Sequence, residues 1–174
     1  MEGGGSVLVS TLKGYELDAY VELWYMGFRT GCDAELIEIP SEGRVLCRIK
    51  RCGLTELLGF IEEAMRGRPW ELRYVKKLWP ISGIYALKDL GRALSDLNGR
   101  LRTLGSDFTL KVEVVMPRRS RGFSKDYIIG RVMEGLAVTV DLENPQVIAL
   151  VFLLGNRALI GLWGPVSVLG IKNR

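Results

Sequence analysis

The hydrophobic pattern of the first eighty residues alternates between two periods, and this alternation is the feature that most constrains the fold. Stretches rich in β-branched residues or with a period of two predict strands, whereas apolar residues three and four apart predict helices. Strands are expected over Val7–Leu12, Ala34–Ile39, Arg44–Lys50 and Glu71–Trp79, and helices over Leu17–Gly27 and Leu54–Gly67. The resulting order, β-α-β-β-α-β, is that of a ferredoxin-like unit.

The second half of the chain predicts another α/β unit. After a connector over Pro80–Leu87, leucine spacing predicts a long amphipathic helix that ends at Gly105. A strand over Thr109–Val115, a helix capped by Ser124 and a hairpin around Gly155-Asn156 follow it. We therefore expect an α+β protein with a ferredoxin-like domain at residues 1–82 and a second domain at residues 83–174.

Several kinds of chemistry find no support in the composition. The chain has no histidine, which excludes His-assisted hydrolysis, His-ligated zinc and imidazole acid–base catalysis. Neither common nucleotide-binding glycine motif occurs, and the three cysteines do not favour a disulfide framework. We expect a protein that is not an enzyme and that needs no cofactor and no metal.

Targeting signals are also missing from the sequence. No stretch approaches the roughly 20 apolar residues that a membrane span requires, and the first residues do not form a signal peptide. The expected location is cytoplasmic, without a membrane partner. The net charge of +4 favours binding to polyanions only slightly. The clustering of the charged residues is therefore more informative than the total charge.

The strongest cluster lies where the strand over Thr109–Val115 leads into the next helix. It has four cations and no acid, and it ends at a helix N-terminus, whose free N–H groups and dipole favour phosphate. A nearby aromatic ring could stack on an unpaired base. The candidate RNA-binding residues are Arg118, Arg119, Arg121, Phe123, Ser124 and Lys125. The alternative interpretation is a solvated basic loop.

Two weaker candidates extend this prediction. Lys76 and Lys77 are flanked by Tyr74 and Trp79, although the solvent side of a strand is the simpler explanation for such a pair taken alone. Arg157 follows the turn of the predicted hairpin. All three are predicted to contact RNA together with the basic cluster.

The segment Leu110–Val114 running into the arginines, and then Val138–Pro145 with its V-D-L-x-N-P turn, resembles a THUMP domain. The opening Val7–Glu16 is similar to the ferredoxin-like portion that precedes such domains. The resemblance implies binding of tRNA through its acceptor stem and 3′ end. It also implies a separate tRNA-modifying enzyme as partner, as for the stand-alone adaptor that helps an acetyltransferase make acetylcytidine.

Other functions remain open at this point. A THUMP subunit could serve a different tRNA modification, such as methylation or thiolation. A ferredoxin-like unit could instead bind a small ligand or dock another protein. RNA binding predicts an affinity that falls steeply with salt, whereas a ligand sensor predicts little salt dependence and a gain of stability with a metabolite.

Overall fold

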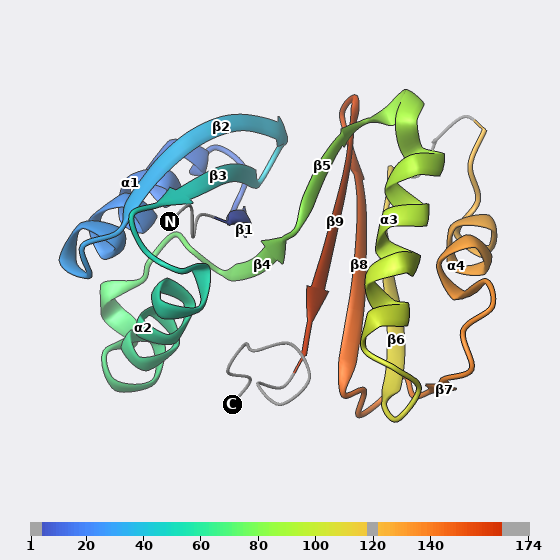
Figure 1. Cartoon of the computed structure of the whole chain (residues 1–174). Coiled ribbons are helices and arrows are strands. Elements are labelled where there is room, and N and C mark those ends of the chain that lie inside the picture. Colours follow the sequence, from blue (N-terminus) through green and yellow to red (C-terminus); the bar gives the residue numbers. More distant parts are fainter. Residues whose placement is uncertain (1–4, 118–121, 165–174) are drawn as a thin grey trace. The chain divides into compact units, whose positions relative to one another are not determined.

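The computed structural model describes residues 5–117 and 122–164 of the 174-residue chain. The chain divides into two compact units, Met1–Ile81 and Ser82–Arg174. Each unit has its own sheet and its own helices (Figure 1).

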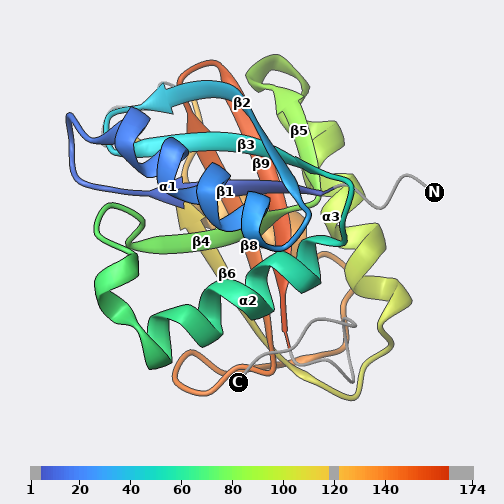
Figure 2. The same cartoon turned by 90° about the vertical axis from the view of Figure 1, so that its left-hand side faces the viewer.

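The N-terminal unit has the predicted order of elements. Its sheet has the strand order β2-β3-β1-β4, and all three strand pairs are antiparallel. Figure 2 shows α1 and α2 lying side by side in front of this sheet. The elements are β1 (Ser6–Ser10), α1 (Glu16–Arg29), β2 (Asp33–Ser41), β3 (Arg44–Lys50), α2 (Leu54–Gly67), the 3-10 turn η1 (Pro69–Glu71) and β4 (Lys77–Ile81).

The core of this unit lies between the helices and the sheet. Val9, Val45 and Ile49 project from the strands and are fully buried, and Leu57 and Ile61 meet them from α2. Helix α1 contributes its buried residues Ala19, Leu23, Met26 and Gly27. Other large apolar residues of α1, among them Trp24 and Phe28, are exposed and do not supply this core.

A disulfide joins Cys32 to Cys52, with a Cα–Cα distance of 5.1 Å. The sequence-based expectation of no disulfide framework is thus wrong. The reason is the register of β2 and β3, which pairs Asp33 with Lys50 and brings the residues just beyond these ends together. Cys47, predicted from its strand position to be a small buried hydrophobe, is fully buried and free.

The predicted fourth strand begins later than expected, at Lys77. The Glu22 carboxylate accepts the backbone N–H groups of Arg73, Tyr74 and Val75, the last at 2.7 Å. An N–H that donates to a side chain cannot take part in a strand ladder. This arrangement fixes residues 73–75 against α1 as an irregular segment.

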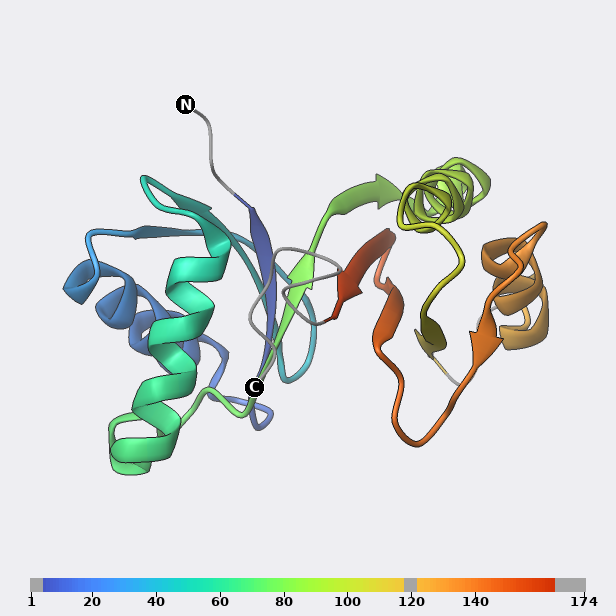
Figure 3. The same cartoon turned by 60° about the horizontal axis from the view of Figure 1, so that its bottom comes forward.

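The C-terminal unit has a mixed sheet with the strand order β5-β9-β8-β6-β7. Strand β6 runs parallel to β7 and β8, whereas β9 is antiparallel to both β8 and β5. Figure 3 shows α3 and α4 along one face of the sheet. The elements are β5 (Gly83–Ala86), η2 (Leu87–Asp89), α3 (Leu90–Thr103), β6 (Thr109–Val115), α4 (Lys125–Met133), β7 (Thr139–Val140), β8 (Val147–Leu154) and β9 (Arg157–Trp163).

Most of this unit agrees with the sequence-based expectations. The bounds of β6 are as predicted, the hairpin β8–β9 turns at Gly155-Asn156, and the Ser124 hydroxyl caps α4 by accepting the N–H of Tyr127 at 3.1 Å. The predicted connector is different, because residues 83–86 form the edge strand β5 on β9. The α+β class is confirmed. In the described ranges, no helix has the length and hydropathy of a transmembrane span.

Candidate RNA-binding surfaces

The predicted basic cluster follows β6. Arg118, Arg119 and Arg121 lie outside the described residues, so their contacts stay a prediction. Beyond them Gly122 has a φ of +98°, a conformation that suits glycine at the approach to a helix. Ser124 then caps α4 and Lys125 is exposed in its first turn. The helix N-terminus is formed as expected and carries one exposed cation.

Phe123 lies in a different environment from the one expected. Its ring is half-buried and packs against the core of the C-terminal unit, with its centroid 6.4 Å from that of Tyr127. Tyr127 is 48% exposed in the first turn of the same helix. Of these two rings, Tyr127 is the more accessible to a base.

Lys77 is the first residue of β4 and is exposed. Its ammonium group lies 4.8 Å from the ring centroid of Trp79, and the guanidinium of Arg44 lies 5.4 Å from the same ring. Trp79 itself is 7% exposed. The two cations are therefore held by the indole at the surface, and the indole is not available for stacking on a base.

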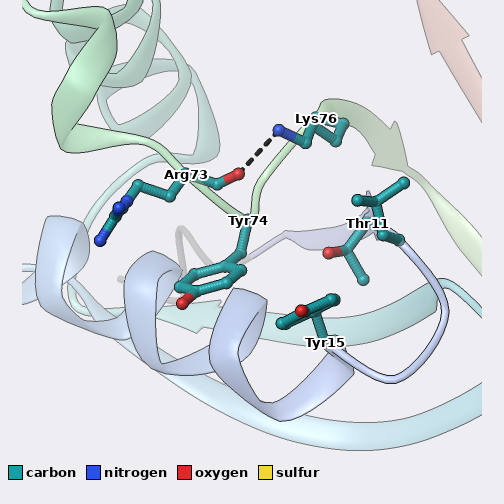
Figure 4. Close-up of a pocket in the computed structure, with 6 residues that line it drawn as sticks. Thr11, Tyr15, Arg73, Tyr74 and Lys76 are labelled. Atoms are coloured by element: carbon teal, nitrogen blue, oxygen red, sulfur yellow. Dashed lines mark hydrogen bonds between the residues drawn. The ribbon is translucent and has the colours of Figure 1, made fainter.

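Lys76 belongs to a separate feature, a pocket of about 310 Å³ that we call the tyrosine pocket (Figure 4). The rings of Tyr15 and Tyr74 are stacked at its side, with centroids 5.3 Å apart and planes inclined by 23°. The Lys76 ammonium donates to the carbonyl of Arg73 at 2.7 Å and is exposed. The lining residues are Thr11, Leu12, Tyr15, Arg73, Tyr74 and Lys76.

Thr11 supplies an unusual polar group to the tyrosine pocket. The residue is 8% exposed, and within the described part of the chain its Oγ1 is buried without a hydrogen-bond partner. Figure 4 shows this hydroxyl directed toward the side of the pocket where Tyr74 lies. A buried hydroxyl is normally hydrogen-bonded. The hydroxyl of Thr11 is thus a polar group at the pocket that its neighbours among the described residues leave without a hydrogen bond.

Local structure explains why these side chains meet. The backbone N–H of Lys76 donates to the carbonyl of Ser10 at 2.8 Å, which holds the segment before β4 next to the end of β1. The Glu22 carboxylate accepts the backbone N–H of Tyr74 at 3.0 Å and so holds this residue from the other side.

A nucleotide needs a flat apolar surface for its base, cations for its phosphate and a hydrogen-bonding group. The tyrosine pocket has all three.

Sequence reasoning found part of this pocket and missed the rest. The sequence predicts Lys76 as a candidate, as one of two lysines flanked by Tyr74 and Trp79. Thr11, Tyr15 and Arg73 were not predicted, because their proximity depends on the antiparallel pairing of β1 with β4.

Arg157, the remaining predicted RNA contact, is the first residue of β9. It is half-buried and paired in register with Leu154 and Ala86.

Groups for acid–base or metal chemistry are sparse. Within residues 5–117 and 122–164, no three His, Cys, Asp or Glu side chains are grouped to hold a metal ion. Burial raises the pKa of the Cys47 thiol to about 12, which keeps it protonated at neutral pH.

Comparison with known proteins places the fold. No protein-family model and no curated protein sequence matches the chain. Among solved structures, it is similar to PH1313 from Pyrococcus horikoshii, at 12% identity and a TM-score of 0.59 over 94% of this chain and 54% of that one. It is also similar to TrmN from Thermus thermophilus, at 21% identity and a TM-score of 0.57 over 90% of this chain and 44% of that one.

A third similar structure is a 4-thiouridine synthetase in complex with RNA and ATP, at 13% identity and a TM-score of 0.51. The match covers 91% of this chain and 41% of that one, so this chain spans about half or less of the proteins it resembles. The fold is THUMP-like, in agreement with the resemblance seen in the sequence.

One expectation is corrected by these similarities. We expected a protein that is not an enzyme, but the same fold occurs in the synthetase and in a possible methylase from Clostridium difficile. The fold therefore gives no ground for excluding enzymatic activity. Missing histidine and missing nucleotide motifs exclude particular kinds of site and not enzymes as a class.

Proposed function

We propose that this chain binds tRNA and presents it for modification, with the acceptor stem and 3′ end as the bound parts. The similar structures support an association with tRNA modification, because they include a 4-thiouridine synthetase in complex with RNA. The observation that carries the proposal is the tyrosine pocket, where stacked rings, an unpaired buried hydroxyl and two cationic side chains line one cavity.

The partner that we propose is a separate tRNA-modifying enzyme, with an acetyltransferase as the first to be tested. Support for this choice comes from the resemblance of the sequence to the stand-alone adaptor. A tRNA held at its end exposes the rest of the molecule to a second protein. Methylating and thiolating enzymes are the next partners to test.

The experiment is a titration of the protein into labelled tRNA at several salt concentrations. Replacing Arg73 and Lys76 by alanine should weaken binding, and it should reduce the slope of log K against log salt by about 2, one for each lost phosphate contact. Tyr15→Ala should weaken binding without changing the slope, because a stacking ring carries no charge.

A charge-matched control comes from Lys88 and Arg92, which are exposed near the start of α3. Their double alanine variant has the same net charge as the pocket variant and should bind like the wild type. Replacing Arg118, Arg119 and Arg121 tests the basic cluster in the same assay. Equal binding by the wild type, the pocket variant and the cluster variant would contradict the proposal, as would a wild type that ignores tRNA.

A further inference from the structure

Helix α1 turns a row of large apolar side chains toward solvent. Leu17 is 60% exposed, Val21 58%, Trp24 42% and Phe28 68%. Their spacing of four, three and four residues keeps them on one side of the helix over three turns. Tyr25, 53% exposed, widens the row. We call these five residues the outer face of α1.

The size of the outer face separates it from ordinary surface hydrophobics. An aromatic side chain has roughly 150–250 Å² of surface, and with exposures of 42–68% the five residues offer on the order of 500 Å² of contiguous apolar area. The largest apolar patch of a typical monomer is roughly 300–600 Å² and is often functional. Two such faces together bury about 1,000 Å², the lower bound for a specific interface.

The surface at the outer face of α1 is not flat. A hollow of about 370 Å³ lies between α1 and the segment before β4. Its apolar walls can receive an aromatic ring, as the pockets at interface centres do. The residues that line it are Leu17, Asp18, Val21, Glu22, Tyr25 and Tyr74.

We propose that the outer face of α1 is the interface of a homodimer, in which the α1 helices of two copies pack antiparallel. A two-fold axis midway between Val21 and Trp24 places each residue of one α1 opposite a residue of the other α1, such that the two residue numbers sum to 45. Val21 then meets the partner's Trp24, and Leu17 meets the partner's Phe28. Each contact joins a smaller side chain to a larger one, and the four-three-four spacing suits helices that cross at a shallow angle.

The charges at the two ends of α1 favour this arrangement. Glu16 and Asp18 lie in the first turn and Arg29 in the last. Arg29 is ion-paired with Glu71 at 2.9 Å, and Glu16 accepts the N–H of Gly43 at 2.7 Å. Antiparallel packing keeps the acidic first turns of the two helices apart and opposes the two helix dipoles. Parallel packing would bring the two acidic first turns together.

A second copy of this chain is therefore the partner that the face fits. An isologous contact requires a surface that is complementary to itself, and the outer face meets this requirement in both shape and charge. The inference can be tested without tRNA. The five residues of the outer face do not line the tyrosine pocket, although Tyr74 lines both that pocket and the hollow.

Sedimentation velocity on the full chain tests the proposal. Between about 1 and 100 µM, the wild type should change from monomer to dimer. Val21→Glu places a carboxylate against the partner's Trp24 and should weaken the dimer by at least about 100-fold. Leu142→Glu is the matched control, because Leu142 is 66% exposed but lies in the C-terminal unit. It should dimerise like the wild type.

A cross-link adds a readout that depends on orientation. A mixture of the single variants Leu17→Cys and Phe28→Cys should give a covalent dimer on mild oxidation, because antiparallel packing places these positions of two copies opposite each other. Neither variant alone should cross-link through its new cysteine, as it would in a parallel pair. A wild type that stays monomeric throughout the range overturns the proposal and leaves the face to a different protein. A dimer that Val21→Glu leaves intact, or a mixture of the two single-cysteine variants that does not cross-link, also overturns it.

Discussion

The disulfide between Cys32 and Cys52 should contribute a measurable part of the free energy of unfolding. It closes a loop with a sequence separation of 20. For a loop of that length, the lost entropy of the unfolded chain corresponds to about 3 kcal/mol at 25 °C. For a chain of this size, each kcal/mol shifts the melting temperature by about 2–4 °C. The double variant Cys32→Ala, Cys52→Ala should therefore melt about 6–12 °C lower than the wild type.

Thermal unfolding followed by circular dichroism measures this shift, and a reductant provides the control. The wild type melted with dithiothreitol should fall to the melting temperature of the double variant, whereas the variant should not respond to the reductant. Thiol titration of the unfolded, unreduced wild type should find one free thiol, that of Cys47, and not the three of the fully reduced chain. Three free thiols, or a wild type whose melting temperature ignores the reductant, would refute the reasoning.

Three further predictions concern single side chains. Glu22→Gln should speed amide hydrogen exchange at Val75 and its two preceding residues, because an amide accepts fewer N–H bonds than a carboxylate; unchanged exchange there would be incompatible with the carboxylate contact. A hydrogen bond from Tyr85 lowers the pKa of Asp96, so this pair stabilises the fold above about pH 4 and the contribution disappears as the pH falls through the lower, folded-state pKa. Asp96→Asn should flatten the acid limb of the melting curve, and an acid limb like that of the wild type would contradict the assignment. In native protein Cys47 should resist thiol reagents at pH 8 and react only on unfolding, because burial raises its pKa to about 12; rapid labelling of the native protein would show the thiol to be accessible.

The order of elements could be predicted because it depends on local patterns. Ser124 followed by a run of helical apolar residues predicts the start of α4, and the structure has the cap at that residue. Val147–Leu154, apolar on both faces, predicts a central strand, and β8 lies between β9 and β6. In both cases a few neighbouring residues contain all the information that is needed.

Other features depend on residues far apart in the sequence. The helical spacing of Leu17, Val21 and Trp24 predicts α1, but the same residues form its exposed side while Ala19 and Leu23 are buried. Apolar periodicity shows that a helix has an apolar face and does not show what covers it. The disulfide and the tyrosine pocket were missed for the same reason, since strand register creates both.

The strand order of the two sheets has a consequence for how the protein is made on the ribosome. Every strand of the N-terminal sheet has been synthesised once Ile81 is added, so this unit can fold while the rest is still being translated. In the second sheet, β8 and β9 are the last two strands in the described part of the chain, but they lie in the middle, between β5 and β6. Until β8 and β9 emerge from the ribosome, β5 has no strand to pair with in this sheet, and the apolar sides of α3 and β6 lack the strands that cover them in the folded unit. The nascent chain should therefore be most vulnerable to proteases and to aggregation during the second half of its synthesis.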